Sequence, residues 1–136
     1  MDENEIVETV CDYLQKKGYE ISQKLHTTEH GVDIIAKNRT SDEVIHIEAK
    51  GGTSSRIGSA RFGKPYSPPQ VFDRAAKGFY TVCQMLSQNK NANSKFALAV
   101  PDTILFRKYL GAVKPAMSKL GISLLLVSQT QEVSEF

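Results

Sequence analysis

Two short apolar segments of this 136-residue chain each carry an acidic residue where a buried strand would ordinarily carry none. Asp33 lies in residues 31–36, and Glu48 and Lys50 lie in residues 44–52. Alternate residues of a strand share one face, so Glu48 and Lys50 are predicted to point the same way. Half-buried charges are costly unless they are paired or hold an ion. Two carboxylates beside an ammonium would suit a Mg²⁺ site that hydrolyses phosphodiester bonds.

The apolar periodicity predicts the elements that must position these side chains. They are, in chain order, a helix over about residues 3–17, strands at 19–25, 31–36 and 44–52, a helix over about 70–86, a strand at 96–100, a helix from 101 that ends at Gly121, and a strand at 122–127. Pro115 should bend or break the third helix. The short spacings favour an antiparallel meander for the first three strands. Residues 129–136 are expected to be loosely held.

This order of elements predicts one mixed sheet with helices on both sides, and residues 1–136 are long enough to form a single domain with a proper core. The net charge of +2 excludes a polybasic arm. Cys11 and Cys83 indicate neither a disulfide framework nor a zinc site. The acidic first residues and the lack of a long apolar run predict a cytoplasmic protein without a membrane span.

Residues 51–69 form a long segment with little core-forming content, three cations and no acid. Loops of this length within a compact domain are usually functional or disordered. Arg56, Arg61 and Lys64 are interleaved with aromatic residues such as Tyr66, a composition that suits phosphate contacts and base stacking. We therefore expect the segment to contact nucleic acid; a plain flexible connection is the alternative.

In residues 31–36 and in Ile47-Glu48-Ala49-Lys50, the chain resembles the PD-(D/E)xK nuclease superfamily, which has the restriction-endonuclease-like fold. The resemblance covers roughly residues 3–100. It looks closest to small Holliday junction resolvase-like and Mrr-like members, which also begin with a Glu-bearing helix and a Gly-aromatic pair. The resemblance implies an α/β fold with an αβββαβ core, a mixed sheet flanked by helices, and here an additional C-terminal helix and strand.

The resemblance also implies a catalytic site. The carboxylates of Asp33 and Glu48, with the backbone carbonyl of Ala49, would hold Mg²⁺ or Mn²⁺. Lys50 would orient the attacking water or offset charge in the transition state. An acid on the first helix would complete the site, and either Glu5 or Glu8 could supply it.

The start of the second helix matches the superfamily only in part. Gln70 is a candidate for the polar residue often found there, whereas Arg74 stands where one nuclease branch has Tyr in a Gln-x-x-x-Tyr pattern. Val32 precedes Asp33, at the position of the Pro in the PD-(D/E)xK motif.

These residues favour a metal-dependent nuclease acting on DNA. The alternatives are a catalytically silent nucleic-acid-binding or regulatory protein with the same fold, and a partner-binding module of a defence or mobile-element system. For the charged residues themselves, an exposed strand face with a cross-strand ion pair is the simpler interpretation. Symmetric cutting of both strands would require a homodimer, and a monomer in light scattering would count against it.

Overall fold

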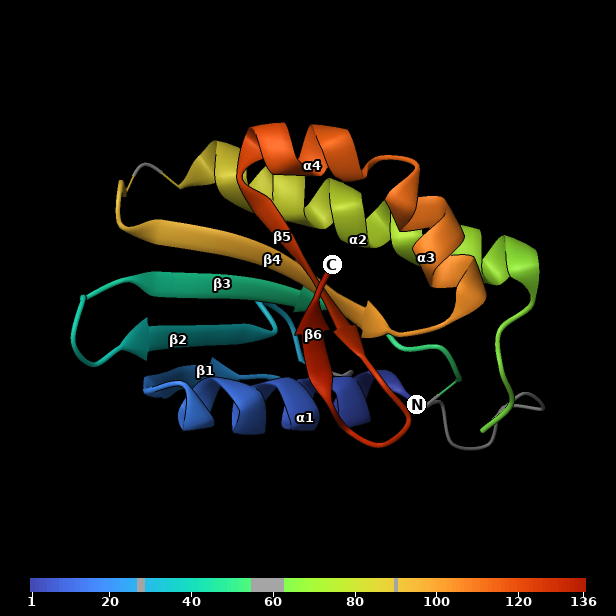
Figure 1. Cartoon of the computed structure of the whole chain (residues 1–136), viewed down its shortest axis with the longest axis horizontal. Helices are drawn as coiled ribbons and strands as arrows, with labels where there is room; N and C mark the ends of the chain where they lie inside the picture. Colours follow the sequence, from blue (N-terminus) through green and yellow to red (C-terminus); the bar gives the residue numbers. More distant parts are fainter. Residues whose placement is uncertain (27–28, 55–62, 90) are drawn as a thin grey trace.

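The computed structural model describes residues 1–26, 29–54, 63–89 and 91–136. Within these ranges a six-stranded sheet separates one helix from three others (Figure 1). The elements, in chain order, are α1 (Glu3–Lys16), β1 (Tyr19–Lys24), β2 (Ile34–Asn38), β3 (Val44–Ala49), α2 (Pro68–Gln88), β4 (Ser94–Pro101), α3 (Ile104–Gly111), α4 (Lys114–Leu120), β5 (Ile122–Val127) and β6 (Val133–Glu135). No helix in the described ranges is long and apolar enough to cross a bilayer.

The strands lie in the order in which they occur in the chain, from β1 to β6. β1, β2 and β3 pair antiparallel, β3, β4 and β5 pair parallel, and β6 returns antiparallel to β5. Parallel neighbours need a crossover, which α2 supplies between β3 and β4, and the α3–α4 pair supplies between β4 and β5. The expected α/β fold with an αβββαβ core and a C-terminal extension is therefore confirmed.

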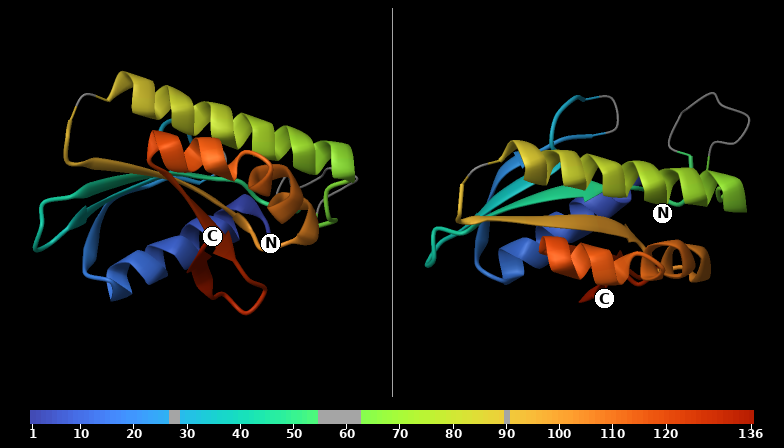
Figure 2. Two further views of the ribbon diagram at one scale, coloured as in Figure 1. Left: turned by 45° about the horizontal axis from the view of Figure 1, so that its top comes forward. Right: turned by 90° about the horizontal axis from the view of Figure 1, so that it is seen from above.

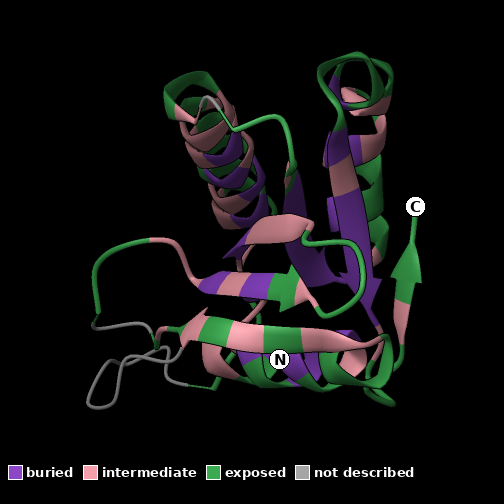
Figure 3. Cartoon of the chain, turned by 90° about the vertical axis from the view of Figure 1, so that its left-hand side faces the viewer, coloured by how far each residue is buried: buried purple, intermediate pink, exposed green. Residues whose placement is uncertain are grey.

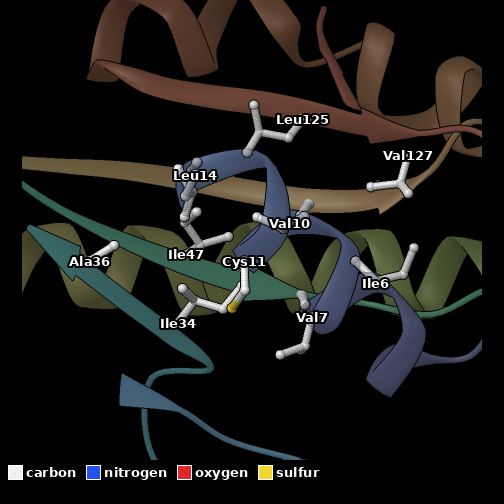
Figure 4. Packing of buried hydrophobic residues seen from close by; sticks show 13 residues of the cluster. Ile6, Val7, Val10, Cys11, Leu14, Ile34, Ala36, Ile47, Leu125 and Val127 are labelled. Atoms are coloured by element: carbon white, nitrogen blue, oxygen red, sulfur yellow. The ribbon is translucent and has the colours of Figure 1, made fainter. Parts of the chain in front are cut away.

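Each face of the sheet has its own apolar core. The apolar side of α1, including Ile6, Val10 and Leu14, packs on one face against strand residues such as Ile47 and Leu125 (Figure 4). On the other face α2 lies along the sheet beside α3 and α4 (Figure 2). Because both faces are covered, β4 and β5 are buried over most of their length (Figure 3).

The second strand begins later than its sequence suggests. β2 starts at Ile34, so Asp33 lies at a bend just before the strand and not within it. The carboxylate of Asp33 accepts a hydrogen bond from the backbone N–H of Ala49 at 2.8 Å. The Asp33 side chain thus accepts the hydrogen bond of the Ala49 N–H, which a backbone carbonyl of a neighbouring strand would otherwise accept. The β2–β3 ladder ends at Ile34.

The C-terminal residues differ most from expectation. The prediction of a loosely held tail is wrong, because β6 pairs with β5 and the backbone N–H of Phe136 donates to the carbonyl of Leu124 at 2.9 Å. Val133 packs against the core on the α1 side. Two apolar residues in a polar stretch, Val133 and Phe136, are too weak a pattern to predict a strand that tertiary pairing stabilises.

Pro115 interrupts the third predicted helix, as expected, and the structure resolves the interruption into two helices. α3 ends at Gly111, and Pro115 lies in the first turn of α4, where its missing N–H costs no hydrogen bond. The start of α3 is also later than predicted: Pro101 closes β4, and the hydroxyl of Thr103 caps the helix by accepting from the N–H of Phe106.

The N-terminus of α1 lies directly against the chain that follows β3. A Cβ atom added to Gly51 would lie 2.4 Å from the backbone nitrogen of Glu3, closer than real contacts allow. The N–H of Gly52 donates to the carbonyl of Met1 at 2.8 Å and holds the two segments together. The Gly-Gly pair is therefore what lets the start of α1 reach the end of β3.

We expect Gly51→Ala to destabilise the protein by about 1–3 kcal/mol, because the new methyl group meets backbone atoms that cannot rotate away. Urea unfolding would measure the loss. Gly111→Ala is the matched control, since a Cβ atom there lies 4.0 Å from the ring of Phe136 and helix propensity favours alanine. A Gly51→Ala protein as stable as the wild type would contradict the close approach.

Candidate active site

The sequence-predicted acids meet where the meander joins the parallel part of the sheet. In the β2–β3 register Ile34 pairs with Ile47, so extending it by one residue brings Asp33 opposite Glu48. Directly opposed residues of antiparallel strands have close side chains. The backbone N–H of Ala49 fixes the carboxylate of Asp33 in this position. The strand register and one side-chain hydrogen bond thus bring together two acids that are 15 residues apart in the sequence.

The carboxyl group of Glu48 is the most perturbed acid of this group. Its side chain is 9% exposed. Burial, followed by the charge of Asp33 and a hydrogen bond with it, raises the pKa of Glu48 from 4.5 to about 8, against the opposing effect of Lys50. Burial beside the Asp33 carboxylate therefore favours the neutral form of Glu48, because a second negative charge is poorly solvated there.

Lys50 lies beside this pair, as the strand alternation predicts. Its Nζ atom is 3.2 Å from Oε1 of Glu48, and its side chain is 15% exposed. The backbone N–H of Lys50 donates to the carbonyl of Ala99 on β4 at 3.0 Å, which holds the residue in line with the sheet just past the end of β3. Asp33, Glu48 and Lys50 therefore form one charged group, which we call the acid–lysine group.

Glu3 brings a further acid to the acid–lysine group from the first turn of α1. Its Oε1 atom is 4.0 Å from Nζ of Lys50. Burial is the main cause that raises the pKa of Glu3; the charge of Lys50 opposes the rise and that of Asp33 adds to it. Sequence reasoning missed Glu3. The signal that could have found it is the Gly51-Gly52 pair, which permits the close approach of the α1 N-terminus.

The two helical acids that the sequence suggested make other contacts. Glu5 belongs to the cap of α1: its N–H donates to Asp2 at 2.9 Å, and its carboxylate accepts from the N–H of Asp2 at 3.3 Å. Glu8 is exposed and pairs with Lys24 at 3.1 Å and with His26 at 3.2 Å. Of the acids of α1, the structure places Glu3 beside Lys50.

Gln70 also has a structural partner. Its Oε1 atom accepts from the N–H of Ser67 at 2.8 Å and from the Ser67 hydroxyl at 3.1 Å, which closes a capping box at the start of α2. A catalytic role for Gln70 would have to rely on its amide nitrogen, because the oxygen is engaged in the cap.

α2 contacts the acid–lysine group at Gly78. A Cβ atom there would lie 2.7 Å from Cδ1 of Leu98 and 3.2 Å from Cγ of Lys50. The helix therefore packs closely on the lysine stem, and only glycine leaves the room. This contact was not predicted, because an isolated glycine inside a helical pattern does not reveal which neighbour approaches it.

Residues 51–69, which we call the basic segment, begin directly after Lys50 of the acid–lysine group. Arg56 and Arg61 lie outside the described residues. Lys64 is exposed and Tyr66 is half-buried. The N–H of Tyr66 donates to the carbonyl of Gly52 at 2.9 Å, so the described end of the segment returns to within two residues of Lys50.

The donor set fits a hard divalent cation. Asp33 and Glu48 offer carboxylate oxygens, and the raised pKa of Glu48 marks a place where a cation could offset their negative charge. In the described ranges no three His, Cys, Asp or Glu side chains could hold a metal ion by themselves. Mg²⁺ commonly takes only one or two carboxylates and keeps several waters, so this pair is sufficient.

Comparison with known proteins agrees with this arrangement. A family model described as "Restriction endonuclease" matches residues 1–65, the part of the chain that holds Asp33, Glu48 and Lys50. The predicted resemblance to the restriction-endonuclease-like superfamily is thereby confirmed.

Two similar curated proteins are UPF0102 proteins. The one from Thermotoga petrophila is 39% identical over 54 residues, which are 39% of this chain and 48% of that protein. The one from Thermotoga neapolitana is 40% identical over 53 residues, which are 38% of this chain and 48% of that protein. The chain spans about half the length of the curated relatives it matches. Among solved structures, SfsA of Pyrococcus furiosus in complex with Ca²⁺ aligns over 93% of this chain and 57% of its own, with 12% identity and a TM-score of 0.44.

The raised pKa of Glu48 predicts a pH dependence of stability in the absence of metal. The unfolded chain releases the Glu48 proton near pH 4.5, whereas the folded protein keeps it to about pH 8. The folded state binds more protons in this window, so its stability falls as the pH rises. Glu48→Gln removes the charge and should become more stable relative to the wild type as the pH rises, by about 1 kcal/mol or more.

Urea unfolding in EDTA at pH 5, 7 and 9 would measure this difference. Glu20→Gln, at an exposed position of β1, is the control and should leave the pH profile unchanged. Parallel profiles for the wild type and Glu48→Gln would show that folding does not raise the pKa of Glu48.

Proposed function

We propose that this restriction-endonuclease-like chain is a divalent-metal-dependent nuclease that hydrolyses phosphodiester bonds, with DNA as its substrate. The observation that carries the proposal is the acid–lysine group. The Glu48 carboxyl group, whose pKa is raised by burial and by Asp33, lies 3.2 Å from the Lys50 ammonium at the end of β3, beside the basic segment. Asp33 lies opposite Glu48 in the extended β2–β3 register. A largely buried group of charges of this kind is costly for stability alone, and such groups cluster at functional sites.

Asp33, Glu48 and the carbonyl of Ala49 would hold Mg²⁺ or Mn²⁺. The cation would polarise the phosphate and make a bound water more acidic. The protein itself limits the freedom of these ligands: the N–H of Ala49 orients Asp33, and pairing of β3 with β4 fixes the backbone that carries Glu48. Ligands held by strands keep their geometry better than ligands on loops.

Lys50 would act on the phosphate and on the attacking water. Its ammonium carries three N–H donors, of which Glu48 engages one. The remaining donors can hydrogen-bond a non-bridging phosphate oxygen or orient the water for attack. The packing of Gly78 on the lysine stem keeps the ammonium in place, so its positive charge meets the negative charge that develops on the phosphate.

Glu3 would take the part of the helical acid. Its Oε1 atom is 4.0 Å from Nζ of Lys50, so its carboxyl group could hydrogen-bond a water that Lys50 orients. The basic segment, with Arg56, Arg61 and Lys64, would contact the backbone of the bound strand. A cytoplasmic setting suits the free thiols Cys11 and Cys83.

Cleavage of a panel of labelled DNAs and RNAs with Mg²⁺ or Mn²⁺ tests the proposal. We expect the wild type to cleave and EDTA to abolish the cleavage. The cleavage rate should fall at least about 100-fold in Asp33→Asn and in Lys50→Ala, because each variant loses a charge that acts on the reacting phosphate. Lys119→Ala, at an exposed position of α4, is the matched control and should cleave normally. A folded wild type that stabilises on adding metal but cleaves nothing would favour the catalytically silent alternative.

The assignment of the helical acid has its own test. We expect Glu3→Gln to reduce the cleavage rate at least tenfold, because the amide keeps the shape but removes the charge beside Lys50. Glu8→Gln should leave the rate unchanged, since Glu8 pairs with exposed Lys24 and His26. Glu5→Gln should change stability more than rate, since its carboxylate belongs to the cap of α1. A larger loss of cleavage rate in Glu5→Gln or Glu8→Gln than in Glu3→Gln would assign the role of helical acid to Glu5 or Glu8 instead.

A further inference from the structure

Arg74 of α2 lies close to the acid–lysine group and has no part in the mechanism above. Its Nη2 atom donates to the hydroxyl of Tyr66 at 3.2 Å. The centre of its guanidinium is also 4.9 Å from the centroid of the Tyr66 ring. A cation over an aromatic ring is attracted to the negative face of the ring. Tyr66 therefore restrains the guanidinium both by its hydroxyl and by its ring.

Tyr66 is itself anchored beside the site. Its N–H donates to the carbonyl of Gly52, and the neighbouring Pro65 forms a β-bridge with Thr53. The two ends of the basic segment are thus joined just after Lys50. This arrangement changes the role predicted for Tyr66: one face of its ring is covered by a cation, so the residue is suited to hold Arg74 and not to stack on a base with that face.

α2 directs Arg74 toward the same place. Arg74 precedes Gly78 by four residues, and residues four apart lie on one face of a helix. Gly78 is the position at which α2 touches the stem of Lys50. The charge of Arg74 also acts on the site, since it lowers the pKa of Glu3 against the rise that burial causes.

Arg74 lacks the partner that a half-buried arginine usually has. Among the described residues, no carboxylate lies within the 4.0 Å of a salt bridge to its guanidinium, although its charge acts on Glu3. A guanidinium is permanently charged and presents a planar fork of donors that matches two phosphate oxygens. The missing counter-ion is therefore of the kind that a nucleic-acid backbone supplies.

We propose that Arg74, restrained by Tyr66, binds the non-bridging oxygens of a backbone phosphate in the strand that occupies the acid–lysine group. The inference rests on the proposed function for the identity of the substrate. It adds a residue that the chemistry itself does not require: Arg74 sets the position of the strand, and Lys50 and the acids act on the bond. In this chain Arg74 stands where the Gln-x-x-x-Tyr pattern of related nucleases has tyrosine, and Tyr66 contributes an aromatic side chain from a different segment.

The test measures binding of a fluorescein-labelled DNA duplex and of its single strand as a function of salt, with Ca²⁺ in place of Mg²⁺. A lost phosphate contact lowers the slope of log affinity against log salt by about one, and a purely structural change does not. We expect Arg74→Met to bind about tenfold more weakly with this smaller slope. Arg74→Lys should retain the slope while losing part of the affinity, because the charge remains and the fork is lost.

Tyr66→Phe tests whether Tyr66 restrains Arg74, since it keeps the ring and removes only the hydroxyl group. That hydroxyl oxygen accepts a hydrogen bond from Nη2 of Arg74 at 3.2 Å. We expect an unchanged slope and a smaller loss of affinity than in Arg74→Met. Lys119→Ala is the charge control and should match the wild type. Urea unfolding of each variant separates a loss of binding from a loss of folding.

The outcomes distinguish this inference from the nuclease proposal. A wild type that binds but does not cleave, with Arg74→Met still lowering affinity and slope, would support the phosphate contact and reject the nuclease. A wild type that cleaves, with Arg74→Met unchanged in affinity and slope, would overturn the inference and leave the nuclease intact. Absence of DNA binding by the folded wild type would overturn the phosphate contact.

Discussion

The hydrogen bond from the N–H of Ala49 to the carboxylate of Asp33 is the interaction on which the site depends. It lies where the β2–β3 ladder stops, and it satisfies a backbone donor with a side chain instead of a strand carbonyl. One bond therefore ends the regular pairing and holds Asp33 opposite Glu48. Burial beside Asp33 raises the pKa of Glu48, so the neutral form of Glu48 is favoured where the two acids meet.

The charge balance around this bond follows from which elements converge there. Acids come from the start of α1, the bend before β2 and the end of β3, and the cations come from Lys50 and Arg74. Two of these close contacts require glycine, which has no side chain. Gly51 leaves room for the backbone of α1, and Gly78 leaves room for the stem of Lys50. Small residues here do not add flexibility; they set how close the charged elements can come.

The two apolar cores keep this charged end of the sheet rigid. α1 covers one face and α2, α3 and α4 cover the other, so β3, β4 and β5 are clamped between layers. The position of Lys50 is set by a backbone hydrogen bond to β4, a strand that is buried over most of its length. A metal or phosphate placed there would meet ligands that need little reorganisation, which is the condition for electrostatic catalysis.

The sequence alone determined the α/β class, the order of the main elements, and the group of Asp33, Glu48 and Lys50. These follow from local physics: apolar periodicity reports one partner face per element, and strand alternation places residues 48 and 50 on one side. Only the tertiary structure decided that Glu3, and not Glu5 or Glu8, lies beside Lys50, that Arg74 meets Tyr66, and that residues 133–135 form a strand. Those outcomes depend on how closely separate elements approach and on pairing between distant segments, and no periodicity within a single element carries that information.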